Sequence, residues 1–221
     1  MNGIIFDMDG VLVDSMPSHC NAWKVAIRNI TNIDIKDKYI YINEGRRGND
    51  FIFQILKENN IPTDEIIMEK IHRKKNELFQ KNGKYNMFPG IKRILNSLSC
   101  QKAVVSGSTK QDVLKIIHDT FGEKMFDVII TADDITIGKP HPMPFLKALK
   151  ALNLKSQNVI VVENAPLGVE AAKNAKIECI VTLNTSPLDI INFSRLVTKD
   201  KIFRDINDAS DKLIKWCNKC C

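Results

Sequence analysis

The chain has 221 residues, 44% of them hydrophobic, and a net charge of +6. This length and composition predict one large domain, or one domain with an insertion, whose core folds without disulfides or structural metals. No apolar run is long enough to span a membrane and no signal-like segment opens the chain, so we expect a soluble, cytoplasmic protein. The lysines are spread along the chain, and the charge favours anionic partners without indicating nucleic acid.

The first predicted element is a short apolar strand at residues 4–6, which ends at Asp7, Asp9 and Gly10. A β-branched run bounded by glycine is typical of a buried central strand in a parallel sheet. Carboxylates avoid a core unless something pairs them, and at a spacing of two residues both can face one pocket. We therefore predict a divalent cation beside Asp7 and Asp9. The alternative, two solvated loop acids, fits poorly with the apolar run before them.

Helices then follow one another through residues 15–83. The first is expected to begin near Pro17 and to carry Trp23 and Ile27 on one face, and a later one begins near Asp64. The densest basic run, residues 72–75, lies on a helical stripe and is typical of a solvated helix face. This segment is interpreted as an inserted helical cap over a core formed by residues 1–14 and 84–221.

Strands and helices alternate after Gly90. Apolar strands are predicted at residues 103–105, 128–130, 159–162 and 179–181, and helices after Thr109, Pro144 and Pro166. This alternation predicts an α/β fold with a three-layer, doubly wound parallel sheet. Residues 191–200 look irregular, and a last helix containing Leu213 is expected to pack on the sheet. Ligands of such sheets bind at the carboxyl ends of the strands.

Polar residues follow three of these strands. Ser106 and Gly107 precede a helix, where a hydroxyl and free N–H groups could hold a phosphate, although the same residues also suit an ordinary turn. Lys139 stands between a glycine and a proline, which can direct this usually solvated side chain inward. Glu163 and Asn164 end the fourth strand and offer oxygen ligands of the kind that Mg²⁺ prefers.

Six cysteines are present. Three stand alone in apolar segments and are expected to be free core residues. The others form a terminal cluster whose spacing could bind a soft metal, but no second pair or histidine lies nearby, so we expect exposed, oxidisable thiols. The isolated cysteines are Cys20, Cys100 and Cys179, and the cluster is Cys217, Cys220 and Cys221.

The four strand ends, taken together and in this order, resemble the haloacid dehalogenase superfamily of aspartate-nucleophile phosphotransferases. The resemblance covers most of the chain. The helical insertion after the first motif resembles the small cap of the branch that includes β-phosphoglucomutase, phosphoglycolate phosphatase and phosphatases of sugar and polyol phosphates. The matching residues are Asp7-Met8-Asp9-Gly10-Val11, Ser106, Gly138-Lys139-Pro140, Glu163-Asn164 and Gly168, with His19 and Trp23 in the cap.

The resemblance implies catalytic roles for four of these residues. Asp7 would attack phosphorus and form an aspartyl-phosphate, while Asp9 would act first as general acid and then as general base. Ser106 and Lys139 would hold the transferred phosphoryl group. Asp7 is expected to be exposed, so its replacement should affect stability little.

The resemblance also implies a cofactor, Mg²⁺, bound by Asp7, Asp9, Glu163 and Asn164. Many relatives have a second carboxylate where this chain has Asn164. An amide oxygen can still ligate Mg²⁺ but carries no charge, so either the metal affinity is lower or Glu163 takes a larger share.

Substrate contacts are expected from Gly107 in the core and from cap residues, although the arginine pair lies a residue or two from the position of the mutase's phosphate-binding arginine. The expected cap contacts are His19, Arg46, Arg47 and Lys75.

These features together predict a Mg²⁺-dependent phosphatase that acts on a small phosphorylated metabolite such as a sugar, polyol or glycolate phosphate. We expect a monomer or a dimer without nucleic-acid or membrane partners. A phosphosugar mutase of the β-phosphoglucomutase type is the main alternative. A binding module without turnover is a third, but folding alone does not require Asp7, Asp9, Ser106 and Lys139 together.

Overall fold

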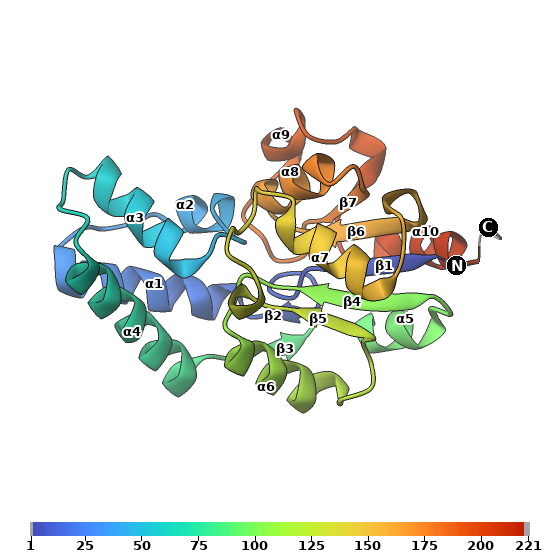
Figure 1. Ribbon diagram of the computed structural model, residues 1–221, viewed down its shortest axis with the longest axis horizontal. Coiled ribbons are helices and arrows are strands. Elements are labelled where there is room, and N and C mark those ends of the chain that lie inside the picture. The colour runs from blue at the N-terminus through green and yellow to red at the C-terminus, as the bar shows by residue number, and fades with distance from the viewer. Residues whose placement is uncertain (1, 219–221) are drawn as a thin grey trace.

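The computed structural model describes residues 2–218 of the chain (Figure 1). Its centre is a six-stranded sheet in which every neighbouring pair is parallel. The strands are β1 (Gly3–Phe6), β4 (Gln101–Val105), β5 (Val128–Ile130), β6 (Val159–Glu163), β7 (Glu178–Thr182) and β8 (Ile202–Phe203). They are arranged in the order β5-β4-β1-β6-β7-β8, so β1 lies between β4 and β6 at the middle of the sheet.

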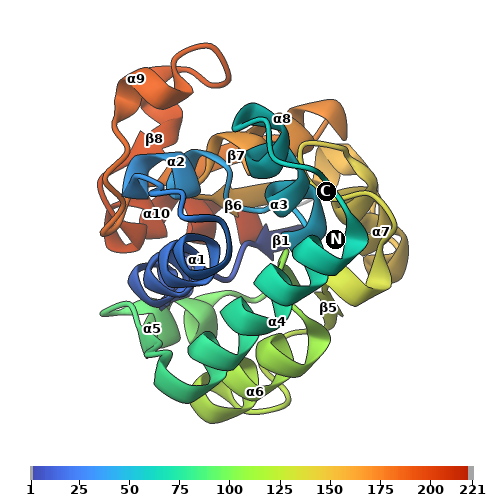
Figure 2. The same cartoon turned by 90° about the vertical axis from the view of Figure 1, so that its left-hand side faces the viewer.

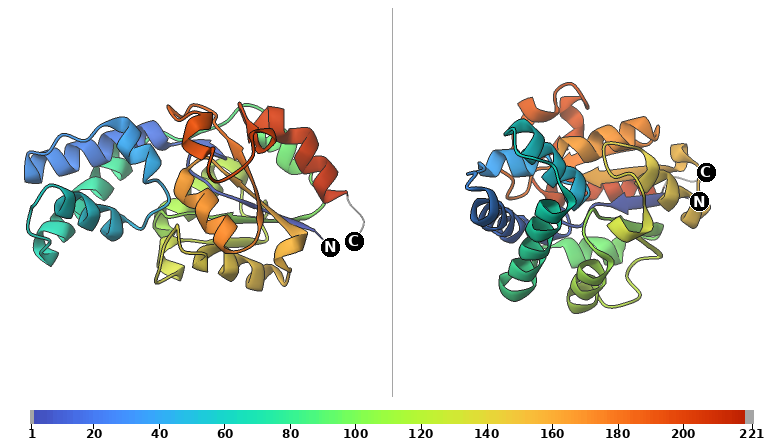
Figure 3. Two further views of the ribbon diagram at one scale, coloured as in Figure 1. Left: turned by 90° about the horizontal axis from the view of Figure 1, so that it is seen from above. Right: turned by 60° about the vertical axis from the view of Figure 1, so that its left-hand side comes forward.

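Helices cover both faces of this sheet, which confirms the predicted three-layer α/β fold (Figures 1 and 3). Alternate strand residues point to opposite faces: Ile4 and Phe6 pack with α5, α6 and α10, whereas Ile5 packs with α7 and α8. Both faces of the sheet are therefore apolar, which explains why the strand sequences are continuous hydrophobic runs. The helices are α5 (Ile91–Ser97), α6 (Lys110–Phe121), α7 (Met143–Leu152), α8 (Pro166–Asn174), the short α9 (Ile190–Phe193) and α10 (Ile206–Cys217).

Between the first and second strands of the sheet, the chain forms the all-helical segment that the sequence predicts. We call residues 15–83 the cap segment. It contains α1 (Met16–Thr31), α2 (Asp37–Ile42), α3 (Gly48–Glu58) and α4 (Glu65–Asn82). A short antiparallel pair, β2 (Val13–Asp14) and β3 (Asn86–Met87), lies where the chain enters and leaves it. Figures 1 and 2 show these helices together at one end of the sheet.

Local sequence signals explain the cap helices. The Asp64 carboxylate accepts a hydrogen bond from the backbone N–H of Ile67 and caps α4. Trp23 of α1 packs edge-to-face on Phe51 of α3, with ring centroids 4.9 Å apart, so aromatic contacts join the helices. No helix within residues 2–218 is long and apolar enough to cross a membrane.

The cysteine prediction is corrected in part. Cys20 and Cys179 are free and buried, as expected. Cys100 and Cys217, however, form a disulfide with their Cα atoms 5.1 Å apart, although 117 residues separate them in sequence. The packing of α10 on α5 brings them together, and sequence spacing does not reveal this tertiary contact. Cys220 and Cys221 lie outside the described residues.

Candidate active site

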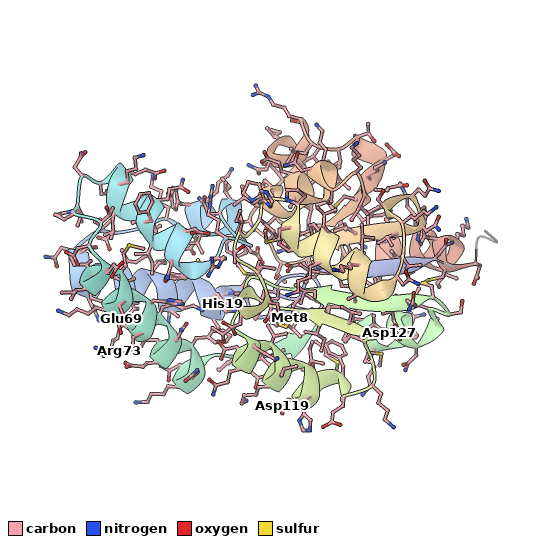
Figure 4. All side chains as sticks on the ribbon, viewed as in Figure 1. Met8, His19, Glu69, Arg73, Asp119 and Asp127 are labelled. Carbon is pink, nitrogen blue, oxygen red and sulfur yellow. A yellow bond between two sulfur atoms is a disulfide. The ribbon has the colours of Figure 1, made fainter. Side chains whose placement is uncertain are left out.

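The carboxyl ends of β1 and β4 meet the cap segment at a cavity of about 80 Å³. Asp7, Asp9, Gly107, Ser108 and Thr109 line it from the core, and the other lining residues belong to the cap segment. In Figure 4, His19 and Met8 are labelled where the cap helices approach the sheet. The cap residues that line the cavity include His19, Trp23, Glu44, Arg46, Phe51, His72, Lys75 and Asn76.

Asp9 is buried and accepts hydrogen bonds from four side chains. One oxygen accepts from Ser15 Oγ at 2.5 Å and lies 3.2 Å from His19 Nε2, both of the cap segment. The other accepts from Ser106 Oγ at 3.2 Å and Ser108 Oγ at 3.1 Å. Burial alone would raise the pKa of Asp9, but the interactions with His19, Ser15 and Ser108 outweigh it and lower the pKa below its usual value. Asp9 is therefore held as a carboxylate.

Asp7 has different neighbours and the opposite shift. Lys139 Nζ lies 2.6 Å from its Oδ1, and the side chain is only 6% exposed. Burial raises the pKa of Asp7 to about 8, with Lys139 opposing this effect and the nearby Glu163 and Asp9 carboxylates adding to it. The expectation of an exposed Asp7 is thus wrong, because the cap segment covers the strand end.

Lys139 also lies 2.5 Å from Glu163 Oε1, so one ammonium joins two buried carboxylates. Burial would lower the pKa of Lys139, but Asp7 and Glu163 reverse this and raise it, which keeps the lysine protonated. The second Glu163 oxygen accepts the backbone N–H groups of Asn164 and Ala165. A side chain at Gly168 would collide with Glu163, because a Cβ there would lie 1.8 Å from Oε1. Gly168 therefore allows α8 to pass directly over this carboxylate.

Lys75 is the buried cation on the cap side of the cavity. Its ammonium lies 5.3 Å from the Trp23 ring centroid and 5.1 Å from that of Phe79, and Phe79 also stacks on His19. Burial is the main cause of the lowered pKa values of Lys75 and His19, and the charge of Lys75 adds to the effect on His19. The prediction that residues 72–75 form a solvated face is therefore wrong for His72 and Lys75, which line the cavity, while Arg73 is exposed.

The two predicted cap arginines lie in different places. Arg46 lines the cavity, and its Nε donates to Asn43 Oδ1 at 3.0 Å. Arg47 is absent from the described lining of the cavity, and its guanidinium donates to the backbone carbonyl of Thr136 in the core. The structure therefore makes Arg47 a contact between cap segment and core and does not support its expected place at the substrate.

Several side chains of the site were not predicted, among them Ser15, His72 and Glu44. Ser15 looks like a helix cap in the sequence, but its hydroxyl donates to Asp9 instead. His72 belongs to a basic run that hides its orientation, because only the packing of α4 on α1 decides which residues turn inward. Glu44 lies in an irregular loop after α2, where no periodicity or motif marks it.

Oxygen atoms of the site are suited to a hard divalent cation such as Mg²⁺. Asn164 Oδ1 and Glu44 Oε1 are both buried and have no hydrogen-bond partner within the described part of the chain. Buried oxygens of this kind, beside the carboxylates of Asp7 and Glu163, are chemically matched to such an ion. Among residues 2–218, no three acidic, histidine or cysteine side chains already converge as a metal site, and Lys139 links Asp7 and Glu163 instead.

Comparison with known proteins gives a consistent picture. The family model for haloacid dehalogenase-like hydrolases matches residues 4–182. A Thermotoga maritima protein named phosphorylated carbohydrates phosphatase is 30% identical over 186 residues, which are 81% of this chain and 84% of that protein. Glycerol-1-phosphate phosphohydrolase 1 of Saccharomyces cerevisiae is 27% identical over 246 residues, covering 98% of this chain and 96% of the yeast protein.

Solved structures share the whole architecture. One described as "Putative beta-phosphoglucomutase from Bacteroides vulgatus" superposes with a TM-score of 0.87 and 31% sequence identity. The superposition covers 100% of this chain and 91% of the other. The similarity therefore includes the cap segment as well as the sheet.

Proposed function

The chain belongs to the haloacid dehalogenase-like hydrolase family, and we propose that it is a Mg²⁺-dependent phosphatase of a small phosphorylated metabolite. One observation carries the proposal. Asp7 and Asp9 line the same cavity at the end of β1, while Lys139 Nζ lies 2.6 Å from Asp7. A nucleophile, an acid–base group and a cation thus lie within reach of one phosphoryl group.

In the proposed reaction, Asp7 attacks phosphorus and the bond to the leaving alkoxide breaks, which leaves an aspartyl-phosphate on Asp7. Asp9 donates a proton to the alkoxide and later removes one from the attacking water. The hydrogen bonds to Asp9 favour its carboxylate form, so it must gain a proton before the first step. The negative charge of an incoming phosphate favours that protonation, because a like charge raises a carboxyl pKa.

Three core residues hold the phosphoryl group in this mechanism. The Ser106 hydroxyl and the backbone at Gly107 can donate to phosphoryl oxygens, and Lys139 balances part of their charge. In the absence of substrate, Lys139 is paired with Asp7 and Glu163.

We assign Mg²⁺ binding to Asp7, the Asp9 backbone carbonyl, Glu163 and Asn164. When bound, the cation neutralises charge on the nucleophile and on the phosphoryl oxygens. A positive charge near Asp7 would also lower its raised pKa, so that the nucleophile is a carboxylate at neutral pH.

The cap segment supports a small substrate. The cavity of about 80 Å³ lies between the cap helices α1, α3 and α4 and the core loops, a size and position that suit a small ligand. Lys75 and Arg46 face it from the cap and can bind polar groups of the leaving alcohol. The names of the Thermotoga and yeast relatives favour a carbohydrate or polyol phosphate. All these residues come from one chain, so we propose that a monomer is active.

The test is a screen of phosphorylated sugars, polyols and phosphoglycolate with detection of released phosphate in the presence of Mg²⁺. We expect turnover of at least one of these esters, and we expect Asp7→Asn to abolish it because an amide is not a nucleophile. Normal turnover by the Asp7→Asn variant would contradict the mechanism.

A phosphosugar mutase is the second candidate, favoured by the presence of His19, Arg46 and Lys75 in the cap wall of the cavity. A mutase must bind a second phosphate there and keep water from the phosphoenzyme. Incubation with β-glucose 1-phosphate, Mg²⁺ and a trace of the 1,6-bisphosphate distinguishes the two. Rapid formation of glucose 6-phosphate with little free phosphate would establish the mutase.

A further inference from the structure

Asn164 makes a contact across the boundary between core and cap. It is 1% exposed, and its Nδ2 donates to Glu44 Oε2 of the cap segment at 2.9 Å. The remaining oxygens of both side chains, Asn164 Oδ1 and Glu44 Oε1, are buried without a partner among residues 2–218. A buried oxygen without a partner is costly, so two in one contact indicate that a donor or cation belongs there.

Glu44 lies in a loop that is pressed against the core. The neighbouring Gly45 has φ +86°, and a Cβ there would lie 2.7 Å from Lys139 Cδ. Two residues further on, Arg47 donates to the Thr136 carbonyl. A side chain at position 45 would be strained and would crowd Lys139, so the loop backbone lies close to the core here, and Glu44 lines the cavity together with Asp7.

The charges around this contact are unbalanced. Asp7 and Glu163 share Lys139, and Asp9 has His19 and three hydroxyls as partners, but no cation forms an ion pair with Glu44 among residues 2–218. The carboxylates of Asp7, Glu163 and Asp9 act electrostatically on Glu44, and their negative charges repel its own. A divalent cation would relieve the repulsion and supply a partner for both free oxygens.

We propose that Glu44 is a further metal-binding residue, contributed by the cap segment, which supplies the negative charge that the neutral Asn164 does not. The inference rests on the proposed function, since it extends the Mg²⁺ site of that reaction. Metal affinity then depends on contact between cap and core. By linkage, the bound metal must favour that contact to the same extent.

The competing explanation is that the contact between Glu44 and Asn164 is purely structural and only joins the cap segment to the core. A glutamine at position 44 separates the two, because its amide oxygen can still accept from Asn164 Nδ2 but its charge is lost. A purely structural contact predicts that Glu44→Gln leaves the metal affinity unchanged. A metal-binding Glu44 predicts a loss.

The experiment measures the dissociation constants of Mg²⁺ by calorimetry and of Mn²⁺ by electron paramagnetic resonance, with no substrate present. Glu44→Gln should weaken binding by about tenfold or more, the usual effect of removing an outer-sphere or direct anionic contact. Glu69→Gln, an exposed change on α4 (Figure 4), is the matched control and should bind as the wild type does.

The variant Asn164→Asp, made in the wild type and in the Glu44→Gln background, provides a second test. A second carboxylate in the core should strengthen metal binding, and the gain should be larger in the Glu44→Gln background than in the wild type. The effects of the two substitutions on metal affinity are then non-additive, as expected when both groups bind the same ion.

Wild-type affinity in Glu44→Gln, or equal gains from Asn164→Asp in both backgrounds, would overturn the assignment of Glu44 and leave the phosphatase proposal intact if the wild type hydrolyses esters with Mg²⁺. A wild-type protein that neither binds the metal nor releases phosphate would overturn both.

Discussion

The ammonium of Lys139 lies 2.6 Å from a carboxylate oxygen of Asp7, in a contact where both side chains are almost fully buried. The same ammonium lies 2.5 Å from Glu163, so three charged groups from different parts of the chain depend on one another. Removing a member of such a cluster leaves an uncompensated charge in a low-dielectric interior. The arrangement that prepares Asp7 for attack is therefore also a part of the fold's stability.

We expect Lys139→Ala to destabilise the protein by about 3–5 kcal/mol, because Asp7 and Glu163 lose their shared partner. Urea unfolding of the metal-free protein measures this. Lys24→Ala removes an exposed ion pair of similar length, 2.7 Å to Asp37, and should cost only about 0–1 kcal/mol. Equal effects of the two changes would show that the buried cluster contributes no more than a surface pair.

Asp9→Asn should slow turnover by roughly 10² to 10⁴, the usual contribution of a general acid or base. The rate of the variant should also depend more steeply on the pKa of the leaving alcohol, because the alkoxide departs without a proton. Rates with a series of substituted phenyl phosphates measure that dependence. An unchanged slope in the variant would argue against Asp9 as the acid.

The stability of the metal-free protein should depend on pH through Asp7, whose pKa is raised from 3.8 to about 8 by burial, against the effect of Lys139. The folded state binds this proton more tightly than the unfolded state. The stabilisation is therefore complete below about pH 4 and is lost as pH rises through about 8.

Asp7→Asn removes this titration, so it isolates the contribution of the carboxyl group. In EDTA, the melting temperature of the wild type minus that of Asp7→Asn should fall between pH 5 and pH 8.5. A difference that stays constant or rises across this range would contradict the raised pKa.

Chelation should remove activity and added Mg²⁺ should restore it, because the oxygen ligands of Asp7, Glu163 and Asn164 are suited to a small hard cation. Ca²⁺ should substitute poorly, since its larger and looser coordination misplaces the phosphoryl group. Phosphate release measured after exhaustive dialysis against EDTA checks this. Full activity in the dialysed protein would exclude metal dependence.

Local sequence determined the parallel α/β core and the positions of Asp7, Ser106, Lys139 and Glu163 at its strand ends. Buried strands must be continuously apolar, and parallel strands bring their carboxyl ends to one edge, so motif order along the chain fixes which polar groups meet there. The all-helical nature of residues 15–83 followed from the helical spacing of their apolar residues, because a helix buries one face.

Tertiary structure alone decided how the cap closes on that edge. Periodicity did not reveal that Lys75 is buried against Trp23, which depends on how α4 packs on α1. Nor did it reveal that Arg47 binds the core or that Glu44 reaches Asn164, which depends on how the cap segment packs on the core. The burial of Asp7 has the same origin. Local patterns report which face of an element is apolar, but contacts between residues far apart in the sequence are set by packing that no local pattern records.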